Sequence, residues 1–137
     1  MPLVRIELTS DRSRAGQRAI ADAVHDALVA VLKIPARDRF QIITAHDAAD
    51  IIAEDAGLGF QRSGRVVIVH IFTQAGRSIQ TKQRIFDELA KRLAAVDVDG
   101  ADLFVAISEN GPQDWSFGFG SAQYVTGELA VPAAASA

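Results

Sequence analysis

The chain has 137 residues, of which 49% are hydrophobic and 23% charged, and its net charge at pH 7 is −3. This length and composition are typical of one globular domain with its own hydrophobic core. The mildly acidic balance argues against binding to nucleic acid or to anionic membranes. Because the sequence contains no cysteine, disulfides, thiolate nucleophiles and cysteine-based metal sites are excluded.

The remaining composition also favours a soluble protein. The three histidines do not have the spacing of metal ligands, and we interpret His25 and His70 as structural. The longest apolar runs fall far short of the ~20 residues that cross a bilayer. The N-terminal sequence lacks the charged-then-apolar layout of a signal peptide. We therefore expect a cytoplasmic protein whose partners include neither nucleic acid nor a membrane.

The first half of the chain predicts a strand, a helix and a second strand. Residues 3–9 alternate between apolar and polar side chains, as in a half-buried strand. Ser13 is a candidate N-cap for a helix whose apolar residues recur every three or four positions. Pro35 ends the helical region, and residues 40–44 predict the second strand.

The second half repeats this order after a connection at 51–60, which predicts a short strand followed by a glycine turn. Residues 66–72 form a β-branched apolar run, Ser78 precedes an amphipathic helix, and residues 103–107 predict the closing strand. A shift of 65 residues aligns the two halves and places Arg12 on Arg77. The closing strands align with a shift that is one residue shorter, which places Asp38 on Asp102.

This duplication predicts an α+β fold with tandem βαβ repeats that share one four-stranded sheet. Right-handed βαβ units place both helices on the same face of that sheet. The other face needs cover, and closed homo-oligomers are the usual solution. We expect one domain at 1–131, with repeats at about 2–45 and 66–108, an aromatic C-terminal segment at 109–131 and a frayed tail at 132–137.

Pro2 has two possible roles. It can simply start the first strand, because proline is tolerated at that position. If Met1 is removed, which aminopeptidases do readily before a small residue, Pro2 becomes a secondary amine with a pKa of roughly 8. Such an amine can act as a general base when neutral, as a proton donor when cationic, or as a nucleophile toward a carbonyl.

Other candidate residues also allow two interpretations. Arg77 follows Gly76 at a helix start, where a cation and free N–H groups suit a carboxylate, although a solvated arginine is equally ordinary there. The same two interpretations apply to Arg12. Asp38 can orient a nearby amine or form a surface ion pair with a neighbouring arginine. The aromatic residues of 115–124 can wall a small pocket or fill the core.

Together these residues resemble the tautomerase superfamily, and within it the malonate semialdehyde decarboxylases. The resemblance covers almost the whole chain. Its most specific part is the tract Asp114-Trp-Ser-Phe-Gly118, followed by Tyr124-Val-Thr-Gly-Glu-Leu129. It also rests on Pro2, on the segments 34–41 and 54–60, and on Gly76-Arg77-Ser78.

The resemblance implies a homotrimer that decarboxylates malonate semialdehyde to acetaldehyde and CO2 without a metal or organic cofactor. Pro2 would be the cationic catalyst, polarising the substrate carbonyl or forming an iminium with it, Asp38 would hold its charge, and Arg77 would bind the substrate carboxylate. The substrate-binding residues would be Gln74, Trp115, Phe117, Tyr124 and Leu129. Hydration of acetylenic acids such as 3-halopropiolates and 2-oxo-3-pentynoate would be a further activity.

One departure from the family pattern concerns the loop before the second helix. The decarboxylases carry two arginines there, whereas this chain has Arg77 alone, with Gln74 near the other position. Glutamine can hydrogen-bond a carboxylate but brings no charge. Two alternatives therefore stay open: a keto–enol tautomerase or haloacrylate dehalogenase or hydratase of the same superfamily, and a non-catalytic trimeric binding module.

Overall fold

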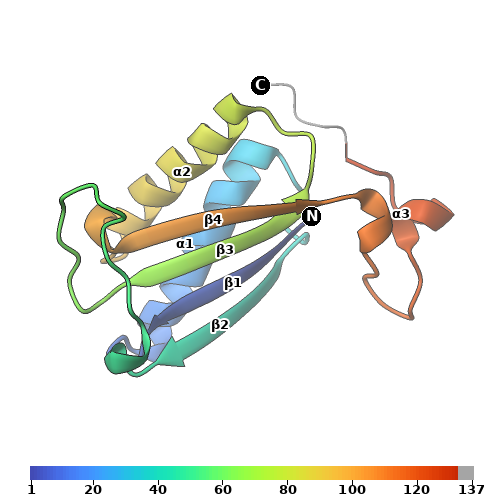
Figure 1. Cartoon of the computed structure of the whole chain (residues 1–137). Helices are drawn as coiled ribbons and strands as arrows, with labels where there is room; N and C mark the ends of the chain where they lie inside the picture. Colours follow the sequence, from blue (N-terminus) through green and yellow to red (C-terminus); the bar gives the residue numbers. More distant parts are fainter. Residues whose placement is uncertain (133–137) are drawn as a thin grey trace.

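The structure, a computed structural model, describes residues 1–132 and consists of one four-stranded sheet with two long helices on one face (Figure 1). The long elements are β1 (Pro2–Thr9), α1 (Arg14–Leu32), β2 (Phe40–His46), β3 (Val67–Gln74), α2 (Ile79–Ala94) and β4 (Leu103–Asn110). The shorter ones are three 3-10 turns, η1 (Ala48–Asp50), η2 (Gly100–Asp102) and η3 (Pro112–Asp114), and the helix α3 (Gln123–Thr126).

The sheet has the order β2-β1-β3-β4, with β1·β2 and β3·β4 parallel and β1·β3 antiparallel. The predicted tandem βαβ arrangement is therefore confirmed. Ser13 and Ser78 both cap their helices, since each hydroxyl oxygen accepts a hydrogen bond from a backbone N–H in the first turn.

The core lies between the sheet and the helices. Alternate residues of β1 and β3, such as Ile6 and Val69, are fully buried against apolar residues of α1 and α2, such as Leu28 and Leu89. Packing of these branched side chains stabilises both halves of the duplication as one domain, because their cluster is continuous.

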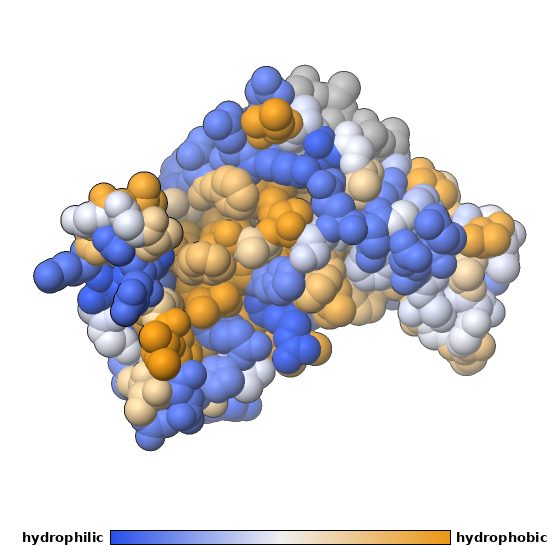
Figure 2. All heavy atoms as spheres, in the orientation of Figure 1, coloured by the Kyte–Doolittle hydropathy of each residue, from blue (hydrophilic) through white to orange (hydrophobic). Residues whose placement is uncertain are grey.

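The opposite face of the sheet is not covered by a helix. Figure 2 shows hydrophobic side chains gathered across the middle of this face, with polar residues around them. Phe40, Ile42 and Phe104 are among its exposed large apolar side chains. An apolar sheet face of this kind indicates an interaction surface.

The antiparallel pairing of β1 and β3 determines what lies near the chain start. Pro2 is paired with Thr73, near the carboxyl end of β3, and Leu3 is paired with Phe40 at the start of β2. The segment after β4 leaves the sheet at the same end (Figure 1). This end therefore collects the N-terminus, the β3–α2 loop and the aromatic segment.

One predicted detail differs from the structure. The short strand expected at 51–60 is wrong: the segment is irregular, it pairs with none of the four strands, and Ile52 is 88% exposed. The glycine turn in it is confirmed, and the Asp55 carboxylate accepts hydrogen bonds from the N–H groups of Gly57 and Gly59. Of the predicted tail, residues 133–137 lie outside the described residues.

None of the helices within residues 1–132 has the length and apolar character needed to span a bilayer.

Candidate active site

The N-terminus lies against Asp38. The Met1 amine is 3.1 Å from Asp38 Oδ2, and Asp38 is only 9% exposed. Its neighbours Arg37 and Arg39 do not neutralise it within the described part of the chain; Arg39 pairs instead with Asp22 at 2.6 Å. The surface ion pair considered for Asp38 is therefore not formed. In this structure the Met1 amine is the cation beside Asp38, and after Met1 removal the Pro2 nitrogen becomes the amine at this end of β1.

Arg77 approaches the same place from the β3–α2 loop. Its Nη1 donates hydrogen bonds to Thr73 Oγ1 at 2.9 Å and to the Gln74 carbonyl oxygen at 2.7 Å. Burial lowers the pKa of Arg77, and the charges of Glu109 and Asp38 oppose this shift. An arginine remains cationic despite such a shift, so Arg77 supplies a partly desolvated positive charge.

Buried polar atoms without a hydrogen-bond partner concentrate at this end of the sheet. Within residues 1–132 there are five such side-chain atoms. Four belong to residues predicted for the site: Asp38 Oδ1, Gln74 Oε1, Arg77 Nε and Tyr124 OH. Because a buried polar group without a partner costs about 1–3 kcal/mol, this concentration is typical of a site that binds a polar ligand.

Tyr124 connects these polar groups to the aromatic segment. Burial, followed by the negative charge of Asp38, raises the pKa of the Tyr124 phenol to about 12, and Arg77 opposes the shift. The phenol is therefore neutral at pH 7 and can donate or accept a hydrogen bond. Its ring packs edge-on against Phe117, with centroids 5.4 Å apart.

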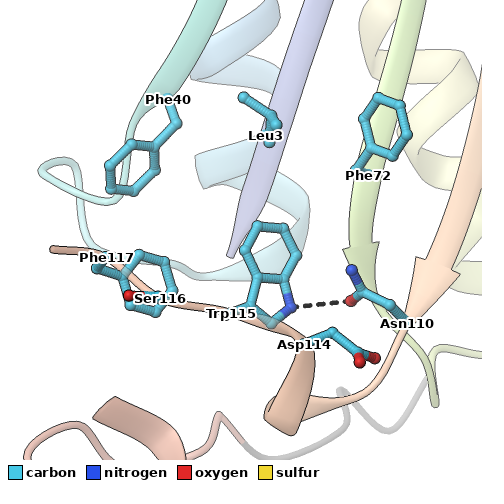
Figure 3. A pocket seen from close by; sticks show the side chains of 8 residues that line it. All are labelled: Leu3, Phe40, Phe72, Asn110, Asp114, Trp115, Ser116 and Phe117. Atoms are coloured by element: carbon cyan, nitrogen blue, oxygen red, sulfur yellow. Dashed lines mark hydrogen bonds between the residues drawn. The ribbon is translucent and has the colours of Figure 1, made fainter. Parts of the chain in front are cut away.

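A cavity of about 460 Å³ lies beside this aromatic pair (Figure 3). Leu3, Phe40 and Phe72 line it from three adjacent strands, and the segment of Trp115 and Phe117 crosses the strand ends opposite them. The Trp115 and Phe117 rings stack with centroids 5.9 Å apart. Two of the three predicted aromatic residues, Trp115 and Phe117, thus line a largely apolar cavity, and Tyr124 does not. Pro2 and Arg77 do not line it; Leu3 is the lining residue nearest to the chain start.

Several supporting residues were not predicted. Asn110 Oδ1 accepts a hydrogen bond from Trp115 Nε1 at 2.8 Å and so orients the indole. The Gln123 side chain bridges the Phe117 N–H and the Gly118 carbonyl. Asn110 and Gln123 lie beside the aromatic tract in the sequence. This position was the signal by which they could have been predicted as supporting residues. Leu129 is 41% exposed, and its role in the apolar wall stays a prediction.

Gln74 lies next to Arg77 but faces the C-terminal segment. Its side chain is buried, and Nε2 donates to the carbonyl oxygen of Pro132 at 3.3 Å. Gln74 Oε1 is one of the unpartnered atoms. Glutamine at this position therefore offers an acceptor, where an arginine would offer only donors.

Arg12, the counterpart of Arg77 in the first repeat, lies at the other end of the sheet. Its Nη1 and Nη2 donate to the carbonyl oxygens of Asp97 and Arg65, at 2.9 and 3.2 Å. Asp102, the counterpart of Asp38, lines one surface pocket together with Arg12. Its carboxylate accepts hydrogen bonds from the N–H and the hydroxyl of Ser63. At this end of the sheet the equivalent residues, one from each repeat, thus hold loops together, without a chain terminus beside them.

Replacing Arg12 by methionine is expected to destabilise the fold by about 2 kcal/mol, because two hydrogen bonds from this buried guanidinium to loop carbonyl oxygens are lost. Activity per folded molecule should stay within twofold of the wild type, since Arg12 is far from the N-terminus along β1. Thermal unfolding and turnover measured on the same sample test this. An Arg12→Met protein with full stability would contradict the structural role.

Comparisons with known proteins identify the family of the chain. Two family models, both described as tautomerase enzyme, match residues 2–61 and 38–118. The chain belongs to the tautomerase family. A curated relative, the probable tautomerase YrdN of Bacillus subtilis (strain 168), is 38% identical over 94% of this chain and 100% of its own length.

Two solved structures bear on the branch of this family. FG41 malonate semialdehyde decarboxylase, inhibited by 3-bromopropiolate, is 74% identical with a TM-score of 0.93, covering 95% of this chain and 99% of its own. A second malonate semialdehyde decarboxylase, studied for its decarboxylase and hydratase activities, is 34% identical with a TM-score of 0.88, covering 93% and 98%. The predicted resemblance to the decarboxylase branch of the tautomerases is confirmed.

A more distant structure supports the fold. A fused 4-OT, described as a symmetric trimer, is 24% identical with a TM-score of 0.76 and covers 91% of this chain and 98% of its own.

Proposed function

We propose that this tautomerase-family chain decarboxylates malonate semialdehyde to acetaldehyde and CO2, with Pro2 as the catalytic amine after Met1 removal. The observation that supports this most directly is the buried contact between the terminal amine and Asp38, with Arg77 nearby. The 74% identity to a malonate semialdehyde decarboxylase supports the choice of substrate.

In this proposal Arg77 binds the substrate carboxylate. It thereby holds the C–C bond that will break perpendicular to the plane of the carbonyl group. The cationic amine of Pro2 lies against the carbonyl oxygen. When the bond breaks, its electron pair moves into the carbonyl, CO2 leaves, and the enolate of acetaldehyde takes up one proton at carbon. The nearby cation stabilises the negative charge that develops on oxygen.

The apolar cavity has a role in the same step. Trp115 and Phe117 keep water away from the bound substrate, so the carboxylate at Arg77 loses hydration, whereas the transition state, with its charge spread away from the departing neutral CO2, loses less. The apolar walls therefore favour loss of CO2.

The protonation state of the amine depends on two opposing effects. In the structure the pKa of the Met1 amine lies below its ordinary value, because burial and the charge of Arg77, which lower it, outweigh the charge and hydrogen bond of Asp38, which raise it. A neutral amine would leave the buried Asp38 carboxylate without its ion-pair partner, which is unfavourable. We therefore assign the cationic form to Pro2 at neutral pH.

Replacing Asp38 by asparagine is expected to lower the pKa of the Pro2 amine by about one unit or more, because an opposite charge nearby is removed. A cationic catalyst is lost as the pH rises through its pKa, so the alkaline limb of the kcat profile should move to lower pH. Asp22→Asn, which removes a surface carboxylate paired with Arg39, is the matched control. A limb that stays in place or moves to higher pH would contradict this role of Asp38.

The function itself is tested by adding malonate semialdehyde to protein shown by mass spectrometry to begin at Pro2. Acetaldehyde and CO2 should form in equal amounts. The second candidate is keto–enol tautomerisation, favoured by the curated relative at 38% identity. Rapid ketonisation of phenylenolpyruvate without CO2 release from malonate semialdehyde would support this candidate and overturn the decarboxylase.

We also propose that the chain works as a homotrimer, located in the cytoplasm. The uncovered apolar sheet face and the trimeric fused 4-OT with the same fold support this assembly. A non-catalytic trimeric module would share it but would not need the Asp38 contact. A solution mass of three times the 14.6 kDa chain is expected by light scattering. A monomer would contradict it.

A further inference from the structure

Asn110 is the last residue of β4, at the point where the chain leaves the sheet for the aromatic segment. Its backbone carbonyl oxygen accepts a hydrogen bond from the Ala75 N–H in the β3–α2 loop at 2.8 Å. Its side-chain Oδ1 accepts the bond from Trp115 Nε1 at 2.8 Å (Figure 3). Asn110 thus has a fixed backbone and a side chain that holds the indole.

The bond between Asn110 and Trp115 is the one hydrogen bond that joins segment 111–118 to the sheet within residues 1–132. The other hydrogen bonds of this segment stay within it or reach the nearby residues Ser121 and Gln123. A segment with so few backbone hydrogen bonds to the rest of the fold depends on side-chain contacts for its position. The indole bond is therefore the polar anchor of this segment.

Trp115 transmits its orientation to the neighbouring rings. Its indole is nearly parallel to the Phe117 ring, at an interplanar angle of 4°. Phe117 in turn contacts the rings of Phe40 in β2 and Tyr124 in α3, with centroids 5.7 and 5.4 Å away. The bond from Trp115 to Asn110 thus fixes the first ring of a connected aromatic wall.

We propose that Asn110 is a positioning residue that acts through the Trp115 N–H to keep this aromatic wall in place, an assignment that rests on the proposed function. Asn110 itself does not need to contact the substrate. With the indole held, water stays out of the cavity, and the bound carboxylate is poorly hydrated before CO2 leaves. A released indole would admit water, which stabilises the bound carboxylate more than the transition state.

The assignment is tested with Asn110→Leu, which removes the acceptor, and with Trp115→Phe, which removes the donor and leaves Asn110 in place. Gln113→Leu is the matched control, because it makes the same replacement at an exposed amide nearby. Both kcat and KM for malonate semialdehyde are measured on protein that begins at Pro2. Since Trp115 is the only tryptophan of the chain, its fluorescence reports the position of the indole.

Asn110→Leu is expected to lower kcat about tenfold, the usual effect of one lost hydrogen bond, and to keep KM within twofold. KM should not rise, because the groups that bind the carboxylate keep their contacts. The indole emission should shift to longer wavelength, and acrylamide should quench it at least twice as fast. Gln113→Leu should change neither kcat nor the emission.

The double variant separates action through the indole from a merely structural role. Trp115→Phe should lower kcat at least tenfold, and adding Asn110→Leu to it should lower kcat less than twofold further. Independent losses that multiply in the double variant would overturn the proposal, because Asn110 would then act apart from the indole. An unchanged kcat in Trp115→Phe would overturn it as well, even where Asn110→Leu does not fold.

An unchanged indole emission in Asn110→Leu would also contradict the proposal, and so would a rise in KM at an unchanged kcat. Absence of CO2 release by the wild type would instead overturn the decarboxylase proposal. The fluorescence comparison needs no turnover, so it tests in that case too whether Asn110 holds the indole.

Discussion

Protein that begins at Met1 is expected to release CO2 from malonate semialdehyde about 10³-fold more slowly than protein that begins at Pro2, the range for loss of a positioned proton donor. Met1 is only 8% exposed, so it fills space at the site. Its amine contacts Asp38 and its carbonyl oxygen accepts a hydrogen bond from Thr73, so Met1 occupies the space beside both residues. Its peptide bond also removes the basicity of the Pro2 nitrogen.

The two forms can be prepared from one chain with and without methionine aminopeptidase, and mass spectrometry identifies each N-terminus. Their thermal unfolding should be similar, because the core between the sheet and the helices does not include Pro2. Equal turnover by the two forms would mean that the amine of Pro2 is not the catalyst.

Replacing Arg77 by methionine is expected to lower kcat/KM about 10³-fold, because a partly desolvated carboxylate would lose its charge partner. Arg77→Lys keeps a charge but loses the planar guanidinium that reaches Thr73 and the substrate together, so about 10²-fold loss is expected. The measurement is kcat/KM for malonate semialdehyde on folded protein.

Arg12→Met is the matched control for Arg77→Met, because the duplication places these two arginines at equivalent loops. Arg12→Met should lose stability and keep activity, and Arg77→Met should show the opposite balance. A loss below tenfold in Arg77→Met would contradict the assignment of the substrate carboxylate to Arg77.

The duplication made most of the fold predictable from the sequence. Both helices have serine caps and clear apolar periodicity, and their ends follow from Ser13, Ser78 and Pro35. The strand ends were less predictable: β3 and β4 extend to Gln74 and Asn110, because backbone pairing continues through polar residues that have no strand pattern. The connection at 51–60 has a short apolar pattern, but its backbone pairs with none of the four strands, so the local signal did not form a strand.

The candidate site was predictable in part. Asp38 and Arg77 could be selected by residue type and loop position, and the parallel register of β1 with β2 explains why Asp38 lies near the N-terminus. Thr73 could not be selected, because its contact with the chain start depends on the antiparallel register of β1 with β3. The same holds for Phe72, which enters the cavity through that register.

The central claim, that a cationic Pro2 drives the reaction, is tested most directly by NMR titration of the ¹⁵N-labelled Pro2 amine in protein that begins at this residue. The account predicts a pKa above 7, because the buried Asp38 carboxylate pairs with the ammonium form. A pKa below 7 would contradict it and would assign Pro2 to the general-base chemistry of a tautomerase.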